Sequence, residues 1–511
     1  MKLKVVAFGN SVTRGTSDLV PSHLTWTFAL ERILDSWLEE DVTVINAGVG
    51  GNTIEDALKR IEKDVLFVNP DLVLVMFGLN DRARVPLEKY RKNLTRIVAI
   101  LKRRGIEPIL MTPNPITENY SKGRGYREYL IASTRIRNYA DVVREVAWNK
   151  YVSLIDIYDF FTRNPQLQKF VPDGVHPNAV AQSAMASFIA KHVLSHLGVD
   201  EFPETELIGF VKVYEDGRHN AFTDLVEWRG EYYVAFRNAS SHFDPTKADG
   251  RIFIMKSKDL TNWAKVGEIH VEGWDNRDPK LYVLGDKLYL FTQSWSPEEK
   301  THRTFMFYTQ DGSKWEGPHD CGEYVYWRPR YFAGYTYVAA YRGWKGGEEG
   351  VVHLLKSKDC ANWELVTIMA KGDYVNETDL FFIDNEAIAF SRRERGARTT
   401  LMLKSKYPFT EWRSKELSEI IQSPAILKHR GMTLLAGRYV DKELKKPSKT
   451  ALFTLINGDV RLIYEFPSGG DNAYPGLLEV GDGLIAVSYY SSHETKSKTT
   501  ANIYLAILSI I

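Results

Sequence analysis

Three residues in the first two hundred carry side chains that together could cleave an ester. Ser11 lies in GNSVTRG, directly after a strand-like run, and Asp173 and His176 lie in DGVHPN. A serine hydroxyl is a poor nucleophile until a base removes its proton, and histidine is suited to do so near neutral pH. Asp173 lies three residues before His176 and can reach the imidazole in a turn, where it would fix the tautomer. We therefore predict a catalytic triad.

Two other segments could supply hydrogen-bond donors to the oxygen that becomes negative during ester cleavage. NAGVGGNT contains Gly51, FGLND contains Asn80, and each segment follows a predicted strand. The carboxyl ends of parallel strands meet at one edge of a sheet, where ligands bind. The backbone N–H groups of Ser11 and Gly51 and the Asn80 amide could form an oxyanion hole. No cofactor and no metal are expected, and the chain has no CxxC motif that could hold zinc.

Strands and helices alternate over residues 1–198 and would position these residues. The predicted strands are unbroken apolar runs, which are typical of a parallel sheet covered by helices on both faces. They are LKVVAFG, VTVINAG, LVLVMFG, PILMTP and SLIDIYD. Amphipathic patterns predict helices over residues 24–38, 53–64, 87–104, 135–149 and 179–197. This alternation predicts an α/β domain of three layers.

The four segments resemble, in order, the four motif blocks of the SGNH hydrolases, also called GDSL-like esterases. The resemblance covers residues 1–198 and implies a flavodoxin-like three-layer fold. It also implies roles for Ser11, Gly51, Asn80 and His176, with Asp173 supporting the histidine. One position departs from the family pattern, because Asn10 precedes the serine where an acidic residue is usual. The resemblance implies hydrolysis of acyl esters, often acetyl esters of carbohydrates, although some members cleave lysophospholipids or thioesters.

Residues 209–511 have a different, repetitive pattern. Three segments share the form [ST]-x-D-x-x-x-W: SKDLTNW, TQDGSKW and SKDCANW, and SKYPFTEW is a degraded fourth copy. Their tryptophans, at positions 263, 315, 363 and 412, are 52, 48 and 49 residues apart. Periods near 50 residues are typical of propeller blades or of another repeat architecture. Six turn-plus-strand units follow this period, so we predict an all-β propeller of six blades, with LIGFVKVY closing the ring. Residues 199–208 are predicted to be the linker.

The repeated segment resembles the Asp box of sialidases, in which the aspartate and tryptophan stabilise a turn between outer strands. A second set of residues resembles the sialidase site: an early arginine, a glutamate, two later arginines and a late tyrosine. That resemblance implies that three arginines bind a substrate carboxylate. It also implies a tyrosine nucleophile activated by the glutamate. The set consists of Arg218, Glu377, Arg392, Arg438 and Tyr474.

The acid/base residue of this second site has several candidates. The loop NASSHFDPTKADG offers Asp244 and Asp249, and His242 is a further candidate. NRDPKLYVLG resembles the RDP motif of five-bladed furanosidases, which would make Asp224, Asp278 and Glu377 an acidic trio. Six counted repeats favour the sialidase-like alternative, with Asp278 at the funnel. Four tryptophans could stack on sugar rings or fill blade interfaces: Trp274, Trp295, Trp327 and Trp344.

The overall composition argues against several other functions. There are 66 Lys and Arg residues against 65 Asp and Glu, a net charge of +1, so neither nucleic acid nor an anionic membrane is an expected partner. No apolar run is long enough to span a membrane, and no secretory signal is visible. Two cysteines, Cys321 and Cys360, form no disulfide framework and fit a cytoplasmic location.

These features predict a carbohydrate-processing hydrolase that acts on an acylated carbohydrate. Its esterase would remove O-acyl groups, most often acetyl, and its propeller would bind the glycan and could cleave it. Two alternatives remain. The propeller could be a lectin-like module without activity, or the esterase could act on lipids or thioesters beside an interaction propeller.

Overall fold

The computed structural model describes residues 2–15, 20–38, 40–342, 349–442, 446–481, 483–495, 497 and 499–511. They form two compact units. The first contains residues 1–209 together with residues 461–467 and 509–511, and the second contains residues 210–460 and 468–508. Each unit is described separately below. None of the helices within the described residues is long and apolar enough to cross a membrane.

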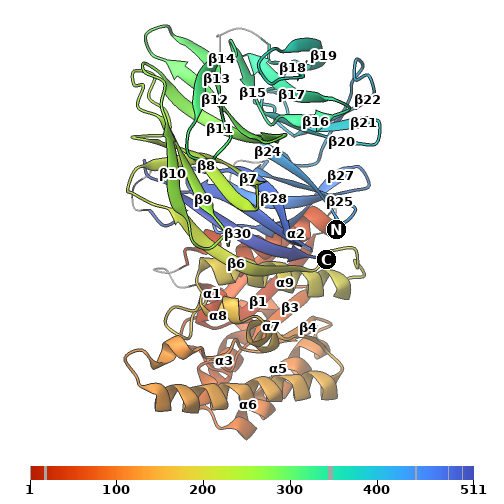
Figure 1. Ribbon diagram of the computed structural model, residues 1–511. Helices are drawn as coiled ribbons and strands as arrows, with labels where there is room; N and C mark the ends of the chain where they lie inside the picture. The colour runs from red at the N-terminus through yellow and green to blue at the C-terminus, as the bar shows by residue number, and fades with distance from the viewer. Residues whose placement is uncertain are drawn as a thin grey trace. The chain divides into compact units, whose positions relative to one another are not determined.

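A parallel five-stranded sheet forms the centre of the first unit (Figure 1). Its spatial order is β2-β1-β3-β4-β5, the flavodoxin-like order, as predicted. Residues Val5 to Phe8 of β1 and all of β3 are buried, as expected for strands covered on both faces. The strands are β1 (Leu3–Gly9), β2 (Val42–Gly48), β3 (Leu72–Met76), β4 (Glu107–Met111) and β5 (Ser153–Ile155).

Helices cover both faces of this sheet. In Figure 1, α9 lies on one side of β1 and β3, and α3 and α5 lie on the other. Helix α2 packs against α9, and α5 packs against both α3 and α6. The helices are α1 (Ser11–Arg14), α2 (Trp26–Leu38), α3 (Ile54–Asp64), α4 (Asp81–Arg84), α5 (Leu87–Arg103), α6 (Tyr126–Lys150), α7 (Ile157–Arg163), α8 (Pro165–Gln168) and α9 (Ala179–His196). Three 3₁₀ turns complete the unit: η1 (Ser22–Leu24), η2 (Leu66–Val68) and η3 (Glu118–Ser121).

Two predicted elements differ from the structure. Helix α6 begins at Tyr126 and not near residue 135. Its first turns expose Tyr126, Leu130 and Ile131, so this part of the sequence lacks the one-sided apolar pattern from which a helix is predicted. The strand expected over SLIDIYD ends at Ile155. Its second half is α7, which Asp156 caps by accepting a hydrogen bond from the Asp159 N–H.

The second unit is built from six antiparallel sheets, the predicted six blades. Five blades have four strands each, and the third has five. The first three blades are β7 (His219–Trp228), β8 (Glu231–Ala239), β9 (Arg251–Ser257), β10 (Ala264–Ile269); β11 (Asp275–Leu284), β12 (Lys287–Ser296), β13 (Thr301–Thr309), β14 (Glu316–Asp320); and β15 (Tyr324–Tyr326), β16 (Arg330–Phe332), β17 (Tyr335–Arg342), β18 (Val351–Ser357), β19 (Glu364–Lys371).

The last blade closes the ring with a strand from the beginning of the propeller. Strand β6 (Thr205–Tyr214), which contains LIGFVKVY, pairs beside β30 as predicted. This pairing gives the last blade its fourth strand and removes a free edge. The remaining strands are β20 (Thr378–Ile383), β21 (Glu386–Ser391), β22 (Leu401–Lys406), β23 (Arg413–Glu416); β24 (Ile420–His429), β25 (Met432–Val440), β26 (Lys449–Ile456), β27 (Asp459–Glu465); and β28 (Asn472–Gly481), β29 (Leu484–Ser491), β30 (Asn502–Ile510). The first strands of neighbouring blades contact each other in the pairs β7 and β11, β20 and β24, β24 and β28, and β28 and β7.

The repeated aspartate and tryptophan lie in the turns between the third and fourth strands of a blade. In the first blade, Asp259 accepts hydrogen bonds from the N–H groups of Thr261 and Asn262, and the Trp263 indole donates to the Leu260 carbonyl. The same contacts recur around Asp359 and Trp363 in the third blade. The aspartate and tryptophan that recur about every 50 residues in the sequence therefore mark the same turn in successive blades.

Four of the innermost strands share a bulge at equivalent positions. In β7, β11, β24 and β28 the pairing register shifts, and one residue in each shift has a left-handed backbone. Bulges and positive φ angles redirect side chains and occur often beside functional sites. The four residues, with φ of 61°, 46°, 49° and 46°, are Phe222, Asp278, Ser423 and Tyr474.

Candidate active site

Ser11 begins a single helical turn at the carboxyl end of β1. The preceding residue, Asn10, caps this turn, because its side-chain oxygen accepts a hydrogen bond of 3.0 Å from the Val12 N–H. Asparagine thus performs a capping role that needs only an acceptor oxygen. The geometry around Ser11 is therefore compatible with asparagine at position 10, where the family usually has an acidic residue.

The structure brings Ser11, His176 and Asp173 into one chain of hydrogen bonds. Ser11 Oγ lies 3.0 Å from His176 Nε2, and His176 Nδ1 lies 2.6 Å from Asp173 Oδ2. The other carboxylate oxygen of Asp173 accepts from the N–H groups of Val175 and His176 at 2.9 and 2.7 Å. This arrangement can hold a proton on Nδ1 and leave the Nε2 lone pair for the serine hydroxyl.

The turn between Asp173 and His176 depends on Gly174. Its φ of 79° is left-handed, and a Cβ there would lie 2.1 Å from the backbone nitrogen of Tyr120. The two segments are also joined by a hydrogen bond from the Thr117 N–H to the Gly174 carbonyl. Only glycine fits this position, so the turn that brings the Asp173 carboxylate to the His176 imidazole requires glycine at position 174.

Asp173 remains ionised in this setting. Burial alone would raise its pKa, but hydrogen bonds from the backbone and side chain of His176 and from the Val175 N–H outweigh it and lower the pKa. A carboxylate that keeps its charge can stabilise the imidazolium that forms when histidine takes the serine proton.

The other two predicted residues lie on the loops after β2 and β3. Gly51 has a φ of 77°, and a Cβ added there would meet nothing within 4 Å, so its backbone conformation and not crowding calls for glycine. The Asn80 amide donates a 2.9 Å hydrogen bond to the carbonyl of Asn52, next to Gly51. Since an amide nitrogen carries two N–H groups, a second one remains for a substrate oxygen.

Asp81 holds these two loops together and was not among the predicted site residues. Its side chain is fully buried, and it accepts 2.7 and 2.9 Å hydrogen bonds from the N–H groups of Ile54 and Gly78. One carboxyl group therefore connects the loop after β2 to the loop after β3. The signal in the sequence was an acidic residue directly after Asn80 in an otherwise apolar segment.

Asp81 should make the unfolding free energy depend on pH. Burial raises its pKa to about 6, although three backbone hydrogen bonds oppose the shift. A raised pKa means that the folded state binds the proton of Asp81 more tightly than the unfolded state does. The protonated carboxyl group therefore adds its full share to the unfolding free energy below about pH 4, and this share is lost as pH rises through 6. We expect wild type to lose about 3 kcal/mol relative to Asp81→Asn between pH 4 and 7. Urea denaturation at a series of pH values measures this difference, and parallel curves would contradict it.

In the propeller, Glu377 joins two of the predicted residues. Its carboxylate accepts a hydrogen bond from the Tyr474 hydroxyl and lies 2.9 Å from Arg392 Nη1. The Ser423 N–H donates to its other oxygen at 2.8 Å. Burial would raise the pKa of Glu377, but the charge of Arg392 and the Tyr474 hydrogen bond lower it, whereas burial raises the pKa of Tyr474. The resting pair is an ionised glutamate and a neutral tyrosine.

Arg438 lies beside this pair and is held by the last blade. It donates to the Asn472 carbonyl at 2.6 Å from Nη2 and at 3.0 Å from Nε, and it contacts Asp471 at 3.3 Å. The centre of its guanidinium is 5.9 Å from the centre of the Tyr474 ring. Arg438, Arg392, Glu377 and Tyr474 therefore form a connected group.

Arg218 and Asp244 make other contacts. Arg218 is half-exposed, donates to Asn238 at 2.9 Å and lies 3.4 Å from Asp249. Asp244 is held by Thr246 in its own loop and by Lys247 at 3.2 Å. Neither residue has a contact with the Glu377 group among the interactions of the described residues.

Two buried carboxyl groups belong to the alternative acidic trio. Asp224 accepts from the Leu281 N–H at 2.8 Å and from Arg328 Nε at 3.2 Å. Asp278 is buried at a bulge, and burial raises its pKa. Within the described residues, none donates a hydrogen bond to its Oδ1. Asp278 thus offers a buried acid with a free oxygen.

Arg277, beside Asp278, was not among the predicted site residues, although it is the arginine of the RDP segment. Its guanidinium lies 5.1 Å from the ring of Phe222, which packs 4.7 Å from the Tyr474 ring. Phe222 therefore contacts both Arg277 and Tyr474, whereas Arg218 has other partners.

The four additional tryptophans have different surroundings. Trp274 packs against Phe305, and Trp327 is fully buried with its indole donating to the Pro424 carbonyl. Trp295 is partly exposed, packs on His302 and donates to the Pro245 carbonyl. Trp344 lies outside the described residues. Of the three described tryptophans, Trp274 and Trp327 fill the interior, and Trp295 alone retains an exposed edge.

Comparisons with known proteins match the part of the chain that carries Ser11. The uncharacterized lipoprotein YqeF of Bacillus subtilis is 34% identical over 177 residues, which are 31% of this chain and 71% of that protein. The arylesterase of Vibrio mimicus is 28% identical over 198 residues, 38% of this chain and 90% of that protein. The acetylxylan esterase of Geobacillus stearothermophilus is 28% identical over 171 residues, 30% of this chain and 74% of that protein. Residues 7–184 match the family model of the GDSL-like lipase/acylhydrolases. Through this N-terminal region, the chain belongs to the GDSL-like lipase/acylhydrolase family.

Proposed function

We propose that residues 1–198 form a serine esterase domain, that residues 199–208 form a linker, and that residues 209–511 form the propeller domain. In the proposed reaction, Ser11 Oγ attacks the carbonyl carbon of an ester while His176 Nε2 accepts the hydroxyl proton. Asp173 holds the histidine tautomer and stabilises the imidazolium. The observation that carries this proposal is the unbroken hydrogen-bond chain from Ser11 through His176 to Asp173.

The remaining steps use the same residues. N–H groups of Ser11, Gly51 and Asn80 donate to the oxyanion of the tetrahedral intermediate. The intermediate collapses, the C–O bond to the alcohol breaks, and His176 gives its proton to the leaving oxygen. Water, deprotonated by His176, then attacks the acyl-serine. The bond from the acyl carbon to Ser11 Oγ breaks, His176 returns its proton to Ser11 Oγ, and the acid is released.

The substrate that we propose is an O-acyl group, above all acetyl, on a carbohydrate. Two features support it. One relative in the same family is an acetylxylan esterase. The second is the propeller, where two partly buried arginines, a glutamate and a tyrosine offer donors and acceptors for a sugar. Polar groups of this kind orient ligands in otherwise apolar sites.

The acyl preference should distinguish this substrate from a lipid or a thioester. We expect kcat/KM for p-nitrophenyl acetate to exceed that for the octanoate by at least about tenfold. A site for acetyl has no apolar channel to bury extra methylenes, each worth about 0.8 kcal/mol when buried. Initial rates over esters of two to eight carbons measure the trend. A preference for octanoate would instead support the lipid or thioester alternative.

For the propeller we propose, as a second activity, sialidase-like cleavage of the same glycan. The observation that favours it is the contact of Tyr474 with Glu377, which also pairs with Arg392. In this proposal, Glu377 takes the phenol proton and Tyr474 attacks the anomeric carbon, while the bond from that carbon to the aglycone oxygen breaks and water protonates that oxygen. A second water then releases the sugar from Tyr474. A lectin-like propeller without turnover is the alternative.

Variants of the pair would separate cleavage from binding. We expect Glu377→Gln and Tyr474→Phe to abolish hydrolysis of a fluorogenic sialoside while p-nitrophenyl acetate hydrolysis persists. Tyr289→Phe, another buried tyrosine of the propeller, is the matched control and should keep both activities. Wild type that binds glycans on an array but cleaves none would favour the lectin-like alternative.

A further inference from the structure

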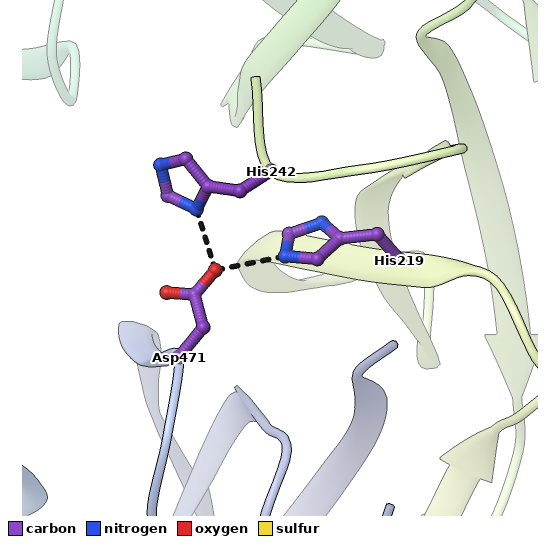
Figure 2. Close-up of side chains that lie close together, drawn as sticks. All are labelled: His219, His242 and Asp471. Carbon is purple, nitrogen blue, oxygen red and sulfur yellow. Dashed lines mark hydrogen bonds and ion pairs between the residues drawn. The ribbon is translucent and has the colours of Figure 1, made fainter. Parts of the chain in front are cut away.

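Three side chains of the propeller converge on one another (Figure 2). The cluster adjoins the Glu377 group through the contact of Asp471 with Arg438, and it includes His242, an acid/base candidate from the sequence. They are His219 on β7, His242 in the loop after β8 and Asp471 directly before β28. One oxygen of Asp471 lies 2.8 Å from His219 Nε2 and 2.5 Å from His242 Nδ1. The three ligand-type atoms all lie within 4.8 Å of one another.

From this arrangement we propose that His219, His242 and Asp471 bind a divalent transition-metal ion, with Zn²⁺ as its principal occupant. Two imidazole nitrogens and one carboxylate oxygen are a ligand set that suits zinc and its neighbours in the first transition row. His219 is completely buried, and its Nε2 faces the Asp471 carboxylate.

The geometry requires only a small adjustment. In a tetrahedral site with bonds of about 2.0–2.1 Å, neighbouring ligand atoms lie roughly 3.3 Å apart. The two imidazole nitrogens lie closer than this to the Asp471 oxygen, at 2.8 and 2.5 Å. An ion would therefore move them away from that oxygen by roughly 0.5 and 0.8 Å. His242 can supply this movement, because its side chain is 48% exposed and lies on a loop. The same exposure leaves a fourth position open to water.

Neighbouring groups orient the carboxylate. The second oxygen of Asp471 accepts a 2.7 Å hydrogen bond from the Tyr490 hydroxyl and lies 3.3 Å from Arg438. Partners of this kind fix metal-binding carboxylates in place. Arg438 also offsets the negative charge of Asp471, so the imidazoles must supply much of the affinity. This balance disfavours Ca²⁺ and Mg²⁺, which need several oxygen ligands.

The position of the cluster indicates what the ion does. His219 and His242 belong to the first blade, and Asp471 leads into the first strand of the last blade. These blades meet where the ring closes, and a backbone bridge joins His219 to Ala501 there. An ion bound by all three residues would fasten the first blade to the last.

The test uses the full chain after treatment with EDTA and removal of the chelator. We expect calorimetric titration with ZnCl₂ to give one site per chain, and CoCl₂ to give visible d–d absorption. ZnCl₂ should raise the thermal unfolding temperature, because a ligand that binds only the folded state stabilises it. CaCl₂ and MgCl₂ should leave that temperature unchanged.

His242→Ala should weaken zinc binding at least about tenfold and abolish the thermal shift, since it removes one of three protein ligands. His319→Ala, an exposed histidine on β14, is the matched control and should bind zinc like wild type. Asp471→Asn, which keeps the side-chain shape, should also lose the cobalt spectrum. Absence of zinc binding in wild type, equal affinity in His242→Ala, or an equal shift with CaCl₂ would overturn the proposal. Because these readouts do not use activity, they are independent of the proposed esterase.

Discussion

Replacing Ser11 with alanine is expected to lower kcat for p-nitrophenyl acetate by about four to six orders of magnitude. The loss follows from the removal of the only oxygen that His176 Nε2 contacts in the hydrogen-bond chain of the candidate site. Substrate binding does not need that oxygen, so KM should change little. Stopped-time assays with the purified variant measure both constants.

A matched control exists in the same unit. Ser153 Oγ also lies 2.9 Å from a histidine nitrogen, Nδ1 of His196. If hydrogen bonding to any histidine were sufficient, Ser153→Ala would reduce activity as well. We expect it to retain wild-type kcat, because Asp173 and the loop donors lie around Ser11. Residual activity of Ser11→Ala within tenfold of wild type would contradict the assigned nucleophile.

Replacing Arg328 with methionine is expected to destabilise the propeller by about 3–5 kcal/mol. Arg328 is buried and extends from the third blade to three others. Its Nε lies 3.2 Å from Asp224, its Nη1 donates to the Pro424 carbonyl at 2.8 Å, and its Nη2 donates to the Pro475 carbonyl at 2.6 Å. Methionine fills similar space but leaves the Asp224 charge and two carbonyls without this partner. Urea denaturation followed by circular dichroism measures the loss.

Arg251→Met provides the comparison. Arg251 pairs with Glu268 at 2.7 Å, but its side chain is 49% exposed. Water solvates both charges after the pair is broken, so the expected loss is within about 1 kcal/mol. Equal losses in the two variants would show that Arg328 contributes no more than a surface pair.

Much of the first unit could be predicted because its signals are local. Strands buried on both faces appear as apolar runs, and parallel strands place their carboxyl ends at one edge. Segments after β1, β2 and β3 therefore had to meet. Where the local signal is absent, the prediction fails. The start of the helix at Tyr126 was predicted too late because its exposed first turns carry no apolar stripe.

The propeller residues were harder to place. Arg218 and Arg277 both lie near the start of an innermost strand, and nothing in their neighbours distinguishes their partners. Arg218 binds Asn238 and Asp249, whereas Arg277 lies against Phe222. The bulges that turn Asp278 and Tyr474 depend on cross-strand pairing, which a single strand does not encode.

The amino-acid sequence alone predicts an α/β region in which Ser11, Asp173 and His176 form a triad, followed by six repeated blades. Each of these features depends on short motifs or on periodicity along the chain. The partners of Arg328 and the meeting of His219 and His242 with Asp471 emerge only from the folded chain. His219 and Asp471 are 252 residues apart, and the closure of a ring brings them together. Contacts across that distance depend on how the blades pack, and no local pattern of residues records them.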